Sequence, residues 1–308
     1  MANTLLTPDV IAKKALANLY EKLCMVPLVY TDVSQEWSSQ KIGSTVTIRQ
    51  PTTFTAQDFD RQSPGITIQN ATETGIPVTL DTHKDVSFQI TAEDLTLELE
   101  DFSTQFLMPA AEAIAQAVDR SIIAQAKADF VQVAGESTDV GYEWNKPEVL
   151  IEADRQLNIK NVPASERSAV IGPSTRAPWL NTEMLKHADK SGTTDALRRG
   201  SLGRDIFGFE TFMTQNIVQP AGSPAVGQPT TEVGLAFHKT AVAFASATLA
   251  LPTDNTWATV VSYKGLSLRL VKQYDMQQKA EIMSLDTLYG TKTLDADRGV
   301  LLRGNLQA

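Results

Sequence analysis

Cysteine is almost absent from this chain. Cys24 is the one cysteine among 308 residues, so no disulfide can form within the chain. Small secreted domains often depend on disulfides, whereas a chain of this length with 42% hydrophobic residues can bury a large core without them. We therefore expect one large domain or two closely associated ones, made in a reducing compartment.

Long apolar runs and an excess of basic residues are also missing. No apolar stretch approaches the ~20 residues that cross a bilayer, and residues 1–7 lack the charged and apolar blocks of a signal peptide. The formal net charge is −9 and the pI is about 4.9, which argues against non-specific phosphate binding by clustered lysine and arginine. We expect a soluble cytoplasmic product with no membrane partner.

Catalytic and cofactor motifs are missing as well. The chain has no Gly-x-Ser-x-Gly elbow, no P-loop and no dinucleotide fingerprint. Its histidines, His83, His187 and His238, are far apart in sequence, and none is part of a metal-binding motif. Residues 295–299 weakly match a calcium loop, but Leu306 stands where the bidentate Glu belongs, so a turn between strands is predicted. We predict no catalytic residue, cofactor or metal ion, and a structural role.

What the sequence does contain is one long amphipathic segment, from 102 to 130. Apolar and small residues recur there at helical spacing, while Glu112, Gln116 and Asp119 fall outside that face. Pro109 suits a first helical turn, and at ~1.5 Å per residue the segment from Pro109 to Phe130 would span roughly 33 Å. Its alanine-rich face predicts a helix that crosses a sheet at close distance.

The stretch 42–90 has a different texture. Val46 and Ile48 predict a strand at one end, and the alternation over 85–90 predicts a strand at the other. A further short pair of strands is expected around 66–69 and 76–80, and nothing in the stretch could bury a core of its own. A thin excursion between two matched strands predicts a projecting hairpin arm that contacts another molecule, with a flexible surface loop as the alternative.

Shorter elements are predicted on both sides of these two segments. Thr7 and Pro8 begin an N-terminal helix that either docks on its own domain or embraces a neighbour, and Cys24 is expected on a helix face as a small buried hydrophobe. The other predicted elements are a loop over 135–146, a helix over 148–158, a buried strand over 168–171, a helix over 174–186, a charged glycine-rich loop over 187–205, a strand that opens at 208, a loop over 219–231, and strands from 257 onward.

The order of these elements resembles that of the major capsid proteins of tailed bacteriophages, which have the Hong Kong 97-type fold. Residues 106–111 are similar to the start of that family's spine helix, and residues 200–203 with 207–209 are similar to the segment that closes its axial-domain loop. The likeness covers nearly the whole chain. The further segments that carry it are 15–19 and 25–29 in the N-terminal arm, and 237–241, 251–252 and 284–290 in the late strands.

The resemblance implies an α+β, Hong Kong 97-like capsid fold. Its implied parts are an N-terminal arm (1–41), an extended β-hairpin loop (42–90), a peripheral domain with the spine helix (91–146), an axial domain (147–256) and C-terminal strands that return to both domains (257–308). It also implies pentamers and hexamers that tile an icosahedral shell. The shell would confine double-stranded DNA without sequence-specific binding, and the protein would pass from the host cytoplasm into the virion capsid.

Three departures from the family refine this expectation. The chain has no lysine between 42 and 83, so a covalent cross-link from a lysine there is excluded and non-covalent contacts are expected. Some relatives carry a scaffolding segment ahead of the arm, whereas here the arm helix is predicted from Thr7. Assembly control would then come from a separate scaffolding protein or from the coat itself. The axial region has no long insertion, so no extra domain is expected. A portal and a decoration protein are the other candidate partners.

Charged residues of the arm and of the axial loop are the candidate contacts between subunits. Exposed ion pairs contribute only ~0–1 kcal/mol each, so we expect them to set register more than adhesion. The candidates are Arg49, Arg61, Arg198 and Arg199, paired with acidic residues of neighbours such as Glu73, Asp81 and Asp195.

Two other functions stay open at this point. An encapsulin-like nanocompartment shell protein would share the fold and enclose protein cargo, and the contents of purified particles would tell the two apart. A soluble α/β enzyme with a dispersed site would instead form a stable low-order oligomer that never builds larger particles.

Overall fold

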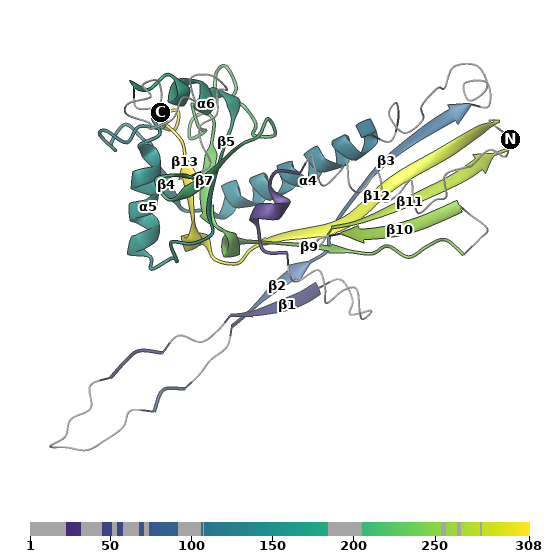
Figure 1. The fold of residues 1–308 in the computed structure, drawn as a ribbon, viewed down its shortest axis with the longest axis horizontal. Coiled ribbons are helices and arrows are strands. Elements are labelled where there is room, and N and C mark those ends of the chain that lie inside the picture. The colour runs from purple at the N-terminus through teal and green to yellow at the C-terminus, as the bar shows by residue number, and fades with distance from the viewer. Residues whose placement is uncertain are drawn as a thin grey trace.

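The computed structural model describes residues 23–31, 45–50, 54–57, 68–70, 74–91, 106, 108–183, 205–253, 257–263, 266–277 and 279–308. An elongated sheet with a long helix beside it forms one part of the molecule, and a more compact region of helices and strands forms another (Figure 1). A thin ribbon projects away from both (Figure 1). Within the ranges just given, no helix is long and apolar enough to span a membrane.

Helix α4 (Met108–Asp129) confirms the long helix predicted from the sequence. Pro109 stands in its first turn, where the missing N–H costs no intrahelical bond, and Lys127 stands in its last turn, near the negative end of the helix dipole. The predicted face is confirmed in part. Its members Ala110, Ile114, Val118, Ile122 and Ala126 are buried, whereas Ala113 is exposed. The buried side also includes four residues that the prediction left outside the face, namely Ala111, Ala115, Asp119 and Ile123.

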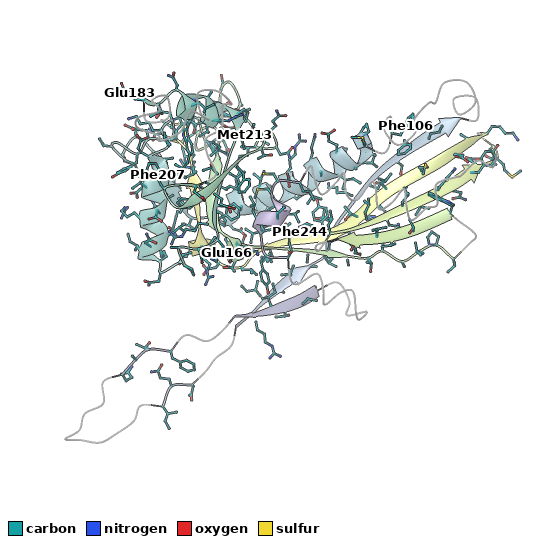
Figure 2. All side chains as sticks on the ribbon, in the orientation of Figure 1. Phe106, Glu166, Glu183, Phe207, Met213 and Phe244 are labelled. Atoms are coloured by element: carbon teal, nitrogen blue, oxygen red, sulfur yellow. The ribbon has the colours of Figure 1, made fainter. Side chains whose placement is uncertain are left out.

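The helix lies along a five-stranded antiparallel sheet, which we call the long sheet (Figure 1). Tyr289 reaches from this sheet to α4, where its hydroxyl is 2.8 Å from the hydroxyl of Ser121. Phe106, just before the helix, stacks on Phe88 with ring centroids 5.5 Å apart (Figure 2). The strands, in spatial order, are β10 (Trp257–Tyr263), β11 (Leu266–Asp275), β12 (Ala280–Thr293) and β3 (Thr82–Thr91), and β9 (Val242–Ala247) pairs with the end of β12.

The compact region is built on a six-stranded mixed sheet. Every residue of its central strands is buried, and most of these residues are apolar, as is typical of strands that are covered on both faces. The order is β4 (Gln132–Ala134), β13 (Gly299–Leu302), β8 (Gly234–His238), β5 (Arg167–Ile171), β7 (Phe209–Met213) and β6 (Asp205–Ile206). The strands therefore come from distant parts of the chain, and β13 pairs in parallel with β4 beside the end of α4.

Two helices complete the compact region. Helix α5 (Val149–Ile159) and helix α6 (Pro173–Leu180) contribute Leu150, Leu157 and Trp179 to its core. The predicted helix over 148–158 and the predicted buried strand over 168–171 are confirmed. The helix predicted over 174–186 is confirmed as far as Leu180, and residues 184–186 lie outside the described ranges.

Short 3-10 helices stand at the connections. They are η1 (Val26–Leu28), η3 (Lys239–Ala241) and η4 (Ala296–Arg298). The last one lies between β12 and β13, so the weak calcium-loop match is a turn between strands, as predicted. The N-terminal helix predicted from Thr7 falls outside the described residues. Cys24 is half-buried in a bend before η1, so its predicted place on a helix face is wrong.

The projecting ribbon consists of β1 (Thr45–Gln50) and β2 (Thr74–Thr79), which pair antiparallel. The two strands expected at the ends of 42–90 do not pair with each other, contrary to the hairpin drawn from the sequence. The later one, β3, pairs with β12 instead, because the apolar face that includes Phe88 is covered by the core of the long sheet. The short strand expected around 76–80 is the true partner of β1, and residues 66–67 lie outside the described ranges.

Candidate assembly surfaces

The root of the ribbon is anchored on the long sheet by a small apolar cluster. Val46 of β1 and Val78 of β2 are both buried. They pack with Ala243 and Ala245 of β9 and with Leu80, which follows β2. The root thus buries its side chains on strands from the C-terminal part of the chain, as expected of a segment that cannot build a core of its own.

A close backbone approach sets the position of this root. A Cβ atom added to Gly290 of β12 would lie 2.0 Å from the carbonyl oxygen of Thr79, the last residue of β2. No side chain can occupy that space, and the obstacle is backbone that cannot rotate away. Glycine at position 290 therefore allows β2 to cross β12 at this distance, and the crossing directs the ribbon.

The outer ribbon, by which we mean residues 54–57 and 68–70, lies beyond the root and away from the rest of the molecule (Figure 1). The side-chain amide of Gln69 joins its two sides, because it accepts the backbone N–H of Thr55 at 3.0 Å and donates to the carbonyl oxygen of the same residue. Phe54 and Ile68 are exposed by 66% and 80%. Large apolar side chains thus stand in water on a segment that the described chain leaves uncovered.

Residues 23–31, which we call the strap, are packed against the core of the molecule. The strap runs along the molecule between the long helix and β9. Met25, Val26 and Val29 are buried in the main core. The strap ends in a parallel bridge with β9, in which the backbone N–H of Tyr30 donates to the carbonyl oxygen of Val242 at 3.0 Å. The strap therefore contacts both the main core and β9.

A buried carboxylate ties the strap to α4. Asp119 accepts the backbone N–H groups of Cys24 and Met25, each at 3.0 Å, and the side-chain amide of Asn216 at 3.3 Å. The prediction that Asp119 lies on the polar side of the helix is wrong, because the side chain is fully buried. Helical spacing could not show that the strap and the loop after β7 cover this side of α4.

Electrostatics at this site follow from burial. Desolvation raises the pKa of the Asp119 carboxyl, and the hydrogen bonds from Cys24, Met25 and Asn216 oppose that rise because they favour the charged form. Burial, with the Asp119 charge as a smaller cause, raises the pKa of the Cys24 thiol to about 12. The thiol is therefore protonated at neutral pH and is a poor nucleophile.

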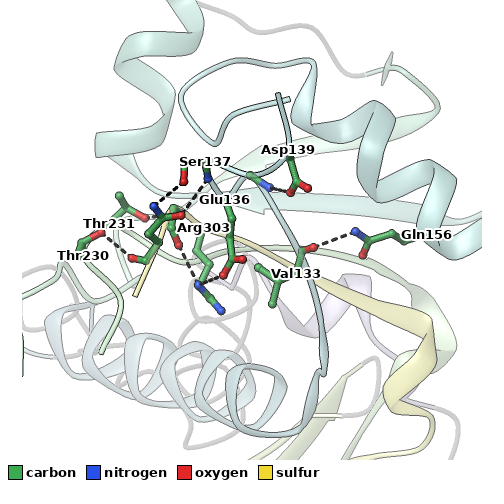
Figure 3. A network of polar contacts seen from close by, with 11 residues as sticks. Val133, Glu136, Ser137, Asp139, Gln156, Thr230, Thr231 and Arg303 are labelled. Atoms are coloured by element: carbon green, nitrogen blue, oxygen red, sulfur yellow. Dashed lines mark hydrogen bonds and ion pairs between the residues drawn. The ribbon is translucent and has the colours of Figure 1, made fainter. Parts of the chain in front are cut away.

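A polar network joins three distant segments of the compact region (Figure 3). Arg303 donates to Glu136 at 2.7 Å, and the N–H of Ser137 donates to the side-chain oxygen of Asn305 at 2.9 Å. Thr230 donates to the backbone oxygen of Asn305 at 2.7 Å. The loop after β4, the loop before β8 and the C-terminal residues are thereby held together, and a cleft of about 360 Å³ lies among them. Its charged lining residues, Glu143 and Lys146, pair with each other at 2.8 Å.

A buried acid also caps helix α6. The helix has no capping side chain of its own, because Gly172 is its N-cap residue. Glu232 supplies the missing acceptor and takes hydrogen bonds from the backbone N–H of Thr175 at 2.8 Å and from its hydroxyl at 3.0 Å. A Cβ atom on Gly172 would lie 1.6 Å from this carboxylate, so the glycine leaves room for the cap.

Of the residues predicted to form ion pairs between subunits, the structure describes Arg49 and Asp81. Arg49 is exposed on β1 opposite Gly75, and Asp81 is exposed in the turn between β2 and β3, where it accepts the hydroxyl of Thr82 at 3.0 Å. The other predicted residues lie outside the described ranges, namely Arg61, Glu73, Asp195, Arg198 and Arg199.

Metal-ligating side chains do not gather in the described parts of the chain. No group of three or more His, Cys, Asp or Glu there could hold an ion. His83 contacts Asp286 at 3.0 Å and His238 contacts Thr240 at 2.9 Å, whereas His187 is not among the described residues. Each described histidine thus has a hydrogen-bond partner, which for His83 is on the neighbouring strand β12 and for His238 is in η3.

Comparison with known sequences supplies the observation that decides the family. A family model described as "P22 coat protein - gene protein 5" matches residues 3–232 of the chain, which is well over half of its length. The chain belongs to the P22 coat protein family. It is therefore a phage capsid protein, a structural component of the virion and not an enzyme. No curated protein sequence matches it.

Solved structures agree on the fold of this coat protein. A chain from Mycobacterium phage Che8 is similar with a TM-score of 0.67 and 19% identity, over 92% of this chain and 91% of that one. A chain from the mature capsid of bacteriophage PhiM1 is similar with a TM-score of 0.58 and 14% identity, over 86% and 83%. The coat protein thus has the Hong Kong 97-type fold of tailed-phage major capsid proteins.

A third similar structure is a virus-like particle from Pyrococcus furiosus. Its TM-score is 0.52 and its identity 11%, over 96% of this chain and 98% of that one. The fold is therefore shared by particles from a phage and from an archaeon. Membership of the coat protein family, and not the fold, separates this chain from other shell proteins.

Proposed function

We propose that this coat protein assembles into pentamers and hexamers of an icosahedral shell that encloses double-stranded DNA. The observation that carries the proposal is the projecting ribbon, whose root is anchored in the chain's own core and whose outer residues stand clear of it. A ribbon held in this way is suited to lie across a neighbouring subunit. In the domain scheme, residues 42–90 would form that extended loop, between an arm over 1–41 and a peripheral domain over 91–146. Residues 147–256 would form the axial domain, and 257–308 would return to both.

The proposed shell is held by non-covalent contacts. The absence of lysine between 42 and 83 removes the amine that a covalent bond from the ribbon would need. Each contact can be weak, because every subunit of a closed symmetric shell makes the same contacts many times. A separate scaffolding protein and a portal are the proposed assembly partners, and a decoration protein is a third candidate.

DNA would be confined by this shell without being bound tightly. The chain carries a formal net charge of −9. Tight binding to phosphates needs clustered lysine and arginine, which displace the counterions around DNA. An acidic surface repels the phosphates instead. The acidic wall of such a shell would repel the phosphates of the packaged DNA.

Electron microscopy of the purified protein tests this function. The protein is expressed alone and together with a candidate scaffolding protein, and closed shells with fivefold and sixfold capsomers are expected. Sedimentation velocity on the same samples measures the fraction of protein in particles. A stable low-order oligomer in every condition would contradict the proposal.

The contents of the particles test the second candidate, an encapsulin-like shell that encloses protein. The similarity to the virus-like particle of Pyrococcus furiosus favours considering it. Particles from infected cells are treated with nuclease and then opened. Nuclease-protected double-stranded DNA is expected of a phage capsid, whereas a defined protein cargo without DNA would support the second candidate.

A further inference from the structure

The cleft of the compact region has the size of a small-molecule site. It lies where the loop after β4, the loop before β8 and the C-terminal residues meet, and its volume is about 360 Å³. Ligand sites in proteins commonly have volumes of about 300–1,000 Å³, so this cleft can hold a small ligand or one unit of a longer one.

Hydrogen-bonding groups without net charge dominate the lining of the cleft. Half of the ten lining residues carry a hydroxyl or an amide, namely Ser137, Asn145, Thr230, Thr231 and Asn305. The charged lining side chains, Glu143 and Lys146, pair with each other at 2.8 Å and so cancel. A ligand in the cleft therefore meets polar groups but no unpaired ion.

Several of these polar groups keep capacity for a ligand. The hydroxyl oxygen of Ser137 accepts the side-chain amide of Asn305 at 2.8 Å, and that of Thr231 accepts the N–H of Gly304 at 2.7 Å. Each hydroxyl thus still has its own proton to donate. Among the described residues, nothing accepts the indole N–H of Trp144, and the exposed side-chain amide of Asn145 has no partner.

The indole of Trp144 is fixed in the wall of the cleft and stays half-buried. Its backbone N–H donates to the carbonyl oxygen of Gly135 at 3.1 Å, and its own carbonyl oxygen accepts the indole N–H of Trp179 at 2.9 Å. A Cβ atom on Gly304 would lie 2.9 Å from Cδ1 of Trp144 and 3.1 Å from Nε1. Glycine at position 304 therefore leaves the space that this edge of the ring occupies.

The polar network around the cleft holds its walls in place (Figure 3). Arg303 donates to Glu136 at 2.7 Å, the N–H of Ser137 donates to Asn305 at 2.9 Å, and Thr230 donates to the backbone oxygen of Asn305 at 2.7 Å. All three lining segments are joined by these bonds. A ligand therefore does not need to order the site, which lowers the entropic cost of binding.

The chemistry of the lining selects one class of ligand. Nucleotides and other phosphate ligands need a free cation or a helix N-terminus, whereas the ammonium of Lys146 is already paired. An aliphatic ligand would leave the hydroxyl and amide groups without partners. A neutral pyranose has C–H groups that can pack on an aromatic ring and a rim of hydroxyls that donate and accept hydrogen bonds. It matches both the indole and the polar groups.

We propose that this cleft binds a neutral saccharide, with one pyranose ring against the indole of Trp144 and its hydroxyls bonded to Ser137, Asn145 and Thr231. This binding activity is separate from the proposed shell function and uses the subunit alone. A site for one ring binds weakly, with a dissociation constant of about 1 mM. Many copies on one particle would bind a polysaccharide far more tightly by multivalency.

The first experiment measures saccharide binding to the unassembled subunit by saturation-transfer NMR. The probes are the methyl glycosides of glucose, galactose, mannose and N-acetylglucosamine. Cyclohexanol serves as a ring with one hydroxyl, and glucuronate as a charged ring. We expect at least one neutral glycoside to bind with a dissociation constant of about 1 mM, and more tightly than both comparison ligands. No binding of any glycoside up to about 20 mM overturns the proposal. Equal or tighter binding of cyclohexanol or glucuronate also overturns it.

Variants locate the bound saccharide. Asn145→Ala removes an exposed amide that has no described partner, so it should weaken binding about fivefold without changing the midpoint of thermal unfolding. Trp144→Phe removes the indole N–H and should abolish any change of tryptophan fluorescence on saccharide addition. Thr138→Ala, at an exposed position of the same loop outside the lining, is the control and should bind like the wild type. Wild-type affinity in both cleft variants, or an equal loss in the control, overturns the proposal.

Assembled particles give the second test. Particles and unassembled subunits are sedimented with a fluorescent polymer of the glycoside that binds best. We expect the polymer to sediment with wild-type particles and to do so much less with Asn145→Ala particles. Polymer that sediments equally with both kinds of particle overturns the proposal. Protein that forms no particles defeats the proposed shell function and leaves the subunit measurement valid, whereas normal particles and subunits without saccharide binding defeat this inference alone.

Discussion

Asp119 accepts a hydrogen bond from the backbone N–H of Met25 at 3.0 Å, although 94 positions of sequence separate them. The neighbouring N–H of Cys24 donates to the other oxygen of the same carboxylate, also at 3.0 Å. One buried acid on α4 thereby satisfies two successive N–H groups of the strap. The carboxylate thereby joins the strap to α4 at two consecutive backbone positions.

Replacing Asp119 with leucine should strongly destabilise the subunit. The substitution leaves the buried N–H groups of Cys24 and Met25 without an acceptor, and each unsatisfied donor costs about 1–3 kcal/mol. We expect the free energy of unfolding of the unassembled subunit, measured with urea, to fall by about 3 kcal/mol. The control is Gln116→Leu, one turn earlier on the exposed side of α4, which should change it by less than about 0.5 kcal/mol. Equal effects of the two variants would show that the strap is not held by Asp119.

Replacing Gly290 with alanine should displace the root of the ribbon. The added Cβ atom would meet the carbonyl oxygen of Thr79 at 2.0 Å, and overpacking of this kind costs about 1–3 kcal/mol. We expect a lower midpoint of thermal unfolding and a lower yield of particles. Gly222→Ala serves as the matched control, because a Cβ atom at that position meets nothing within 4 Å. A variant at 290 that assembles and unfolds like the control would mean that β2 can shift at no cost.

Reversing the charge of Arg61, by Arg61→Glu, should disturb assembly without unfolding the subunit. Exposed ion pairs contribute only about 0–1 kcal/mol each, so the expected defect lies in the register and shape of particles more than in their critical concentration. Particle morphology is scored by electron microscopy, and subunit folding by circular dichroism. The double variant Arg61→Glu with Glu73→Arg restores opposite charges and should recover regular shells if these two residues pair between subunits. Regular particles from the single variant would refute the assignment.

The stability of the subunit should decrease on acidification partly through His238. Burial, and after it the charge of Arg298, lowers the pKa of this imidazole below its usual value, and its Nδ1 accepts the N–H of Thr240 at 3.2 Å. The folded state therefore resists protonation. As pH falls through about 6.5, the unfolded chain takes up the proton first and stability is lost.

Urea unfolding at pH ~7.5 and ~5.5 measures this contribution. The variant His238→Asn can retain an acceptor for the N–H of Thr240 but cannot titrate. We expect the free energy of unfolding to fall less steeply with pH in the variant than in the wild type. The same slope in both would place the pH dependence elsewhere in the chain.

Elements with a strong local pattern were predictable. Helix α4 begins at Met108 beside Pro109, and Ile114, Val118 and Ile122 of the face that its spacing indicates are buried. Leu266, Leu268 and Leu270 of β11 are all buried, as their alternation predicts. These patterns depend on residues three, four or two positions apart, so the sequence displays them directly.

The pairing of elements was less predictable. Both β2 and β3 have the alternation of a strand that could pair with β1, and local pattern cannot choose between them. In the structure β1 pairs with β2, because the longer apolar face of β3 packs with β12 and α4. Gln69 gave no signal either, since its role is to bind the backbone of a residue on the opposite side of the ribbon.

The sequence alone determined four features: the long helix, the alternating strands, the absence of a recognisable catalytic motif and the likeness to a phage coat protein. Each of them depends on neighbours along the chain. Long-range packing settled the rest. It buried Asp119 under the strap, brought Glu232 to the start of α6 and let Thr79 pass Gly290 without a side chain between them. Contacts of this kind join groups that are far apart in the chain, so no local sequence pattern indicates them.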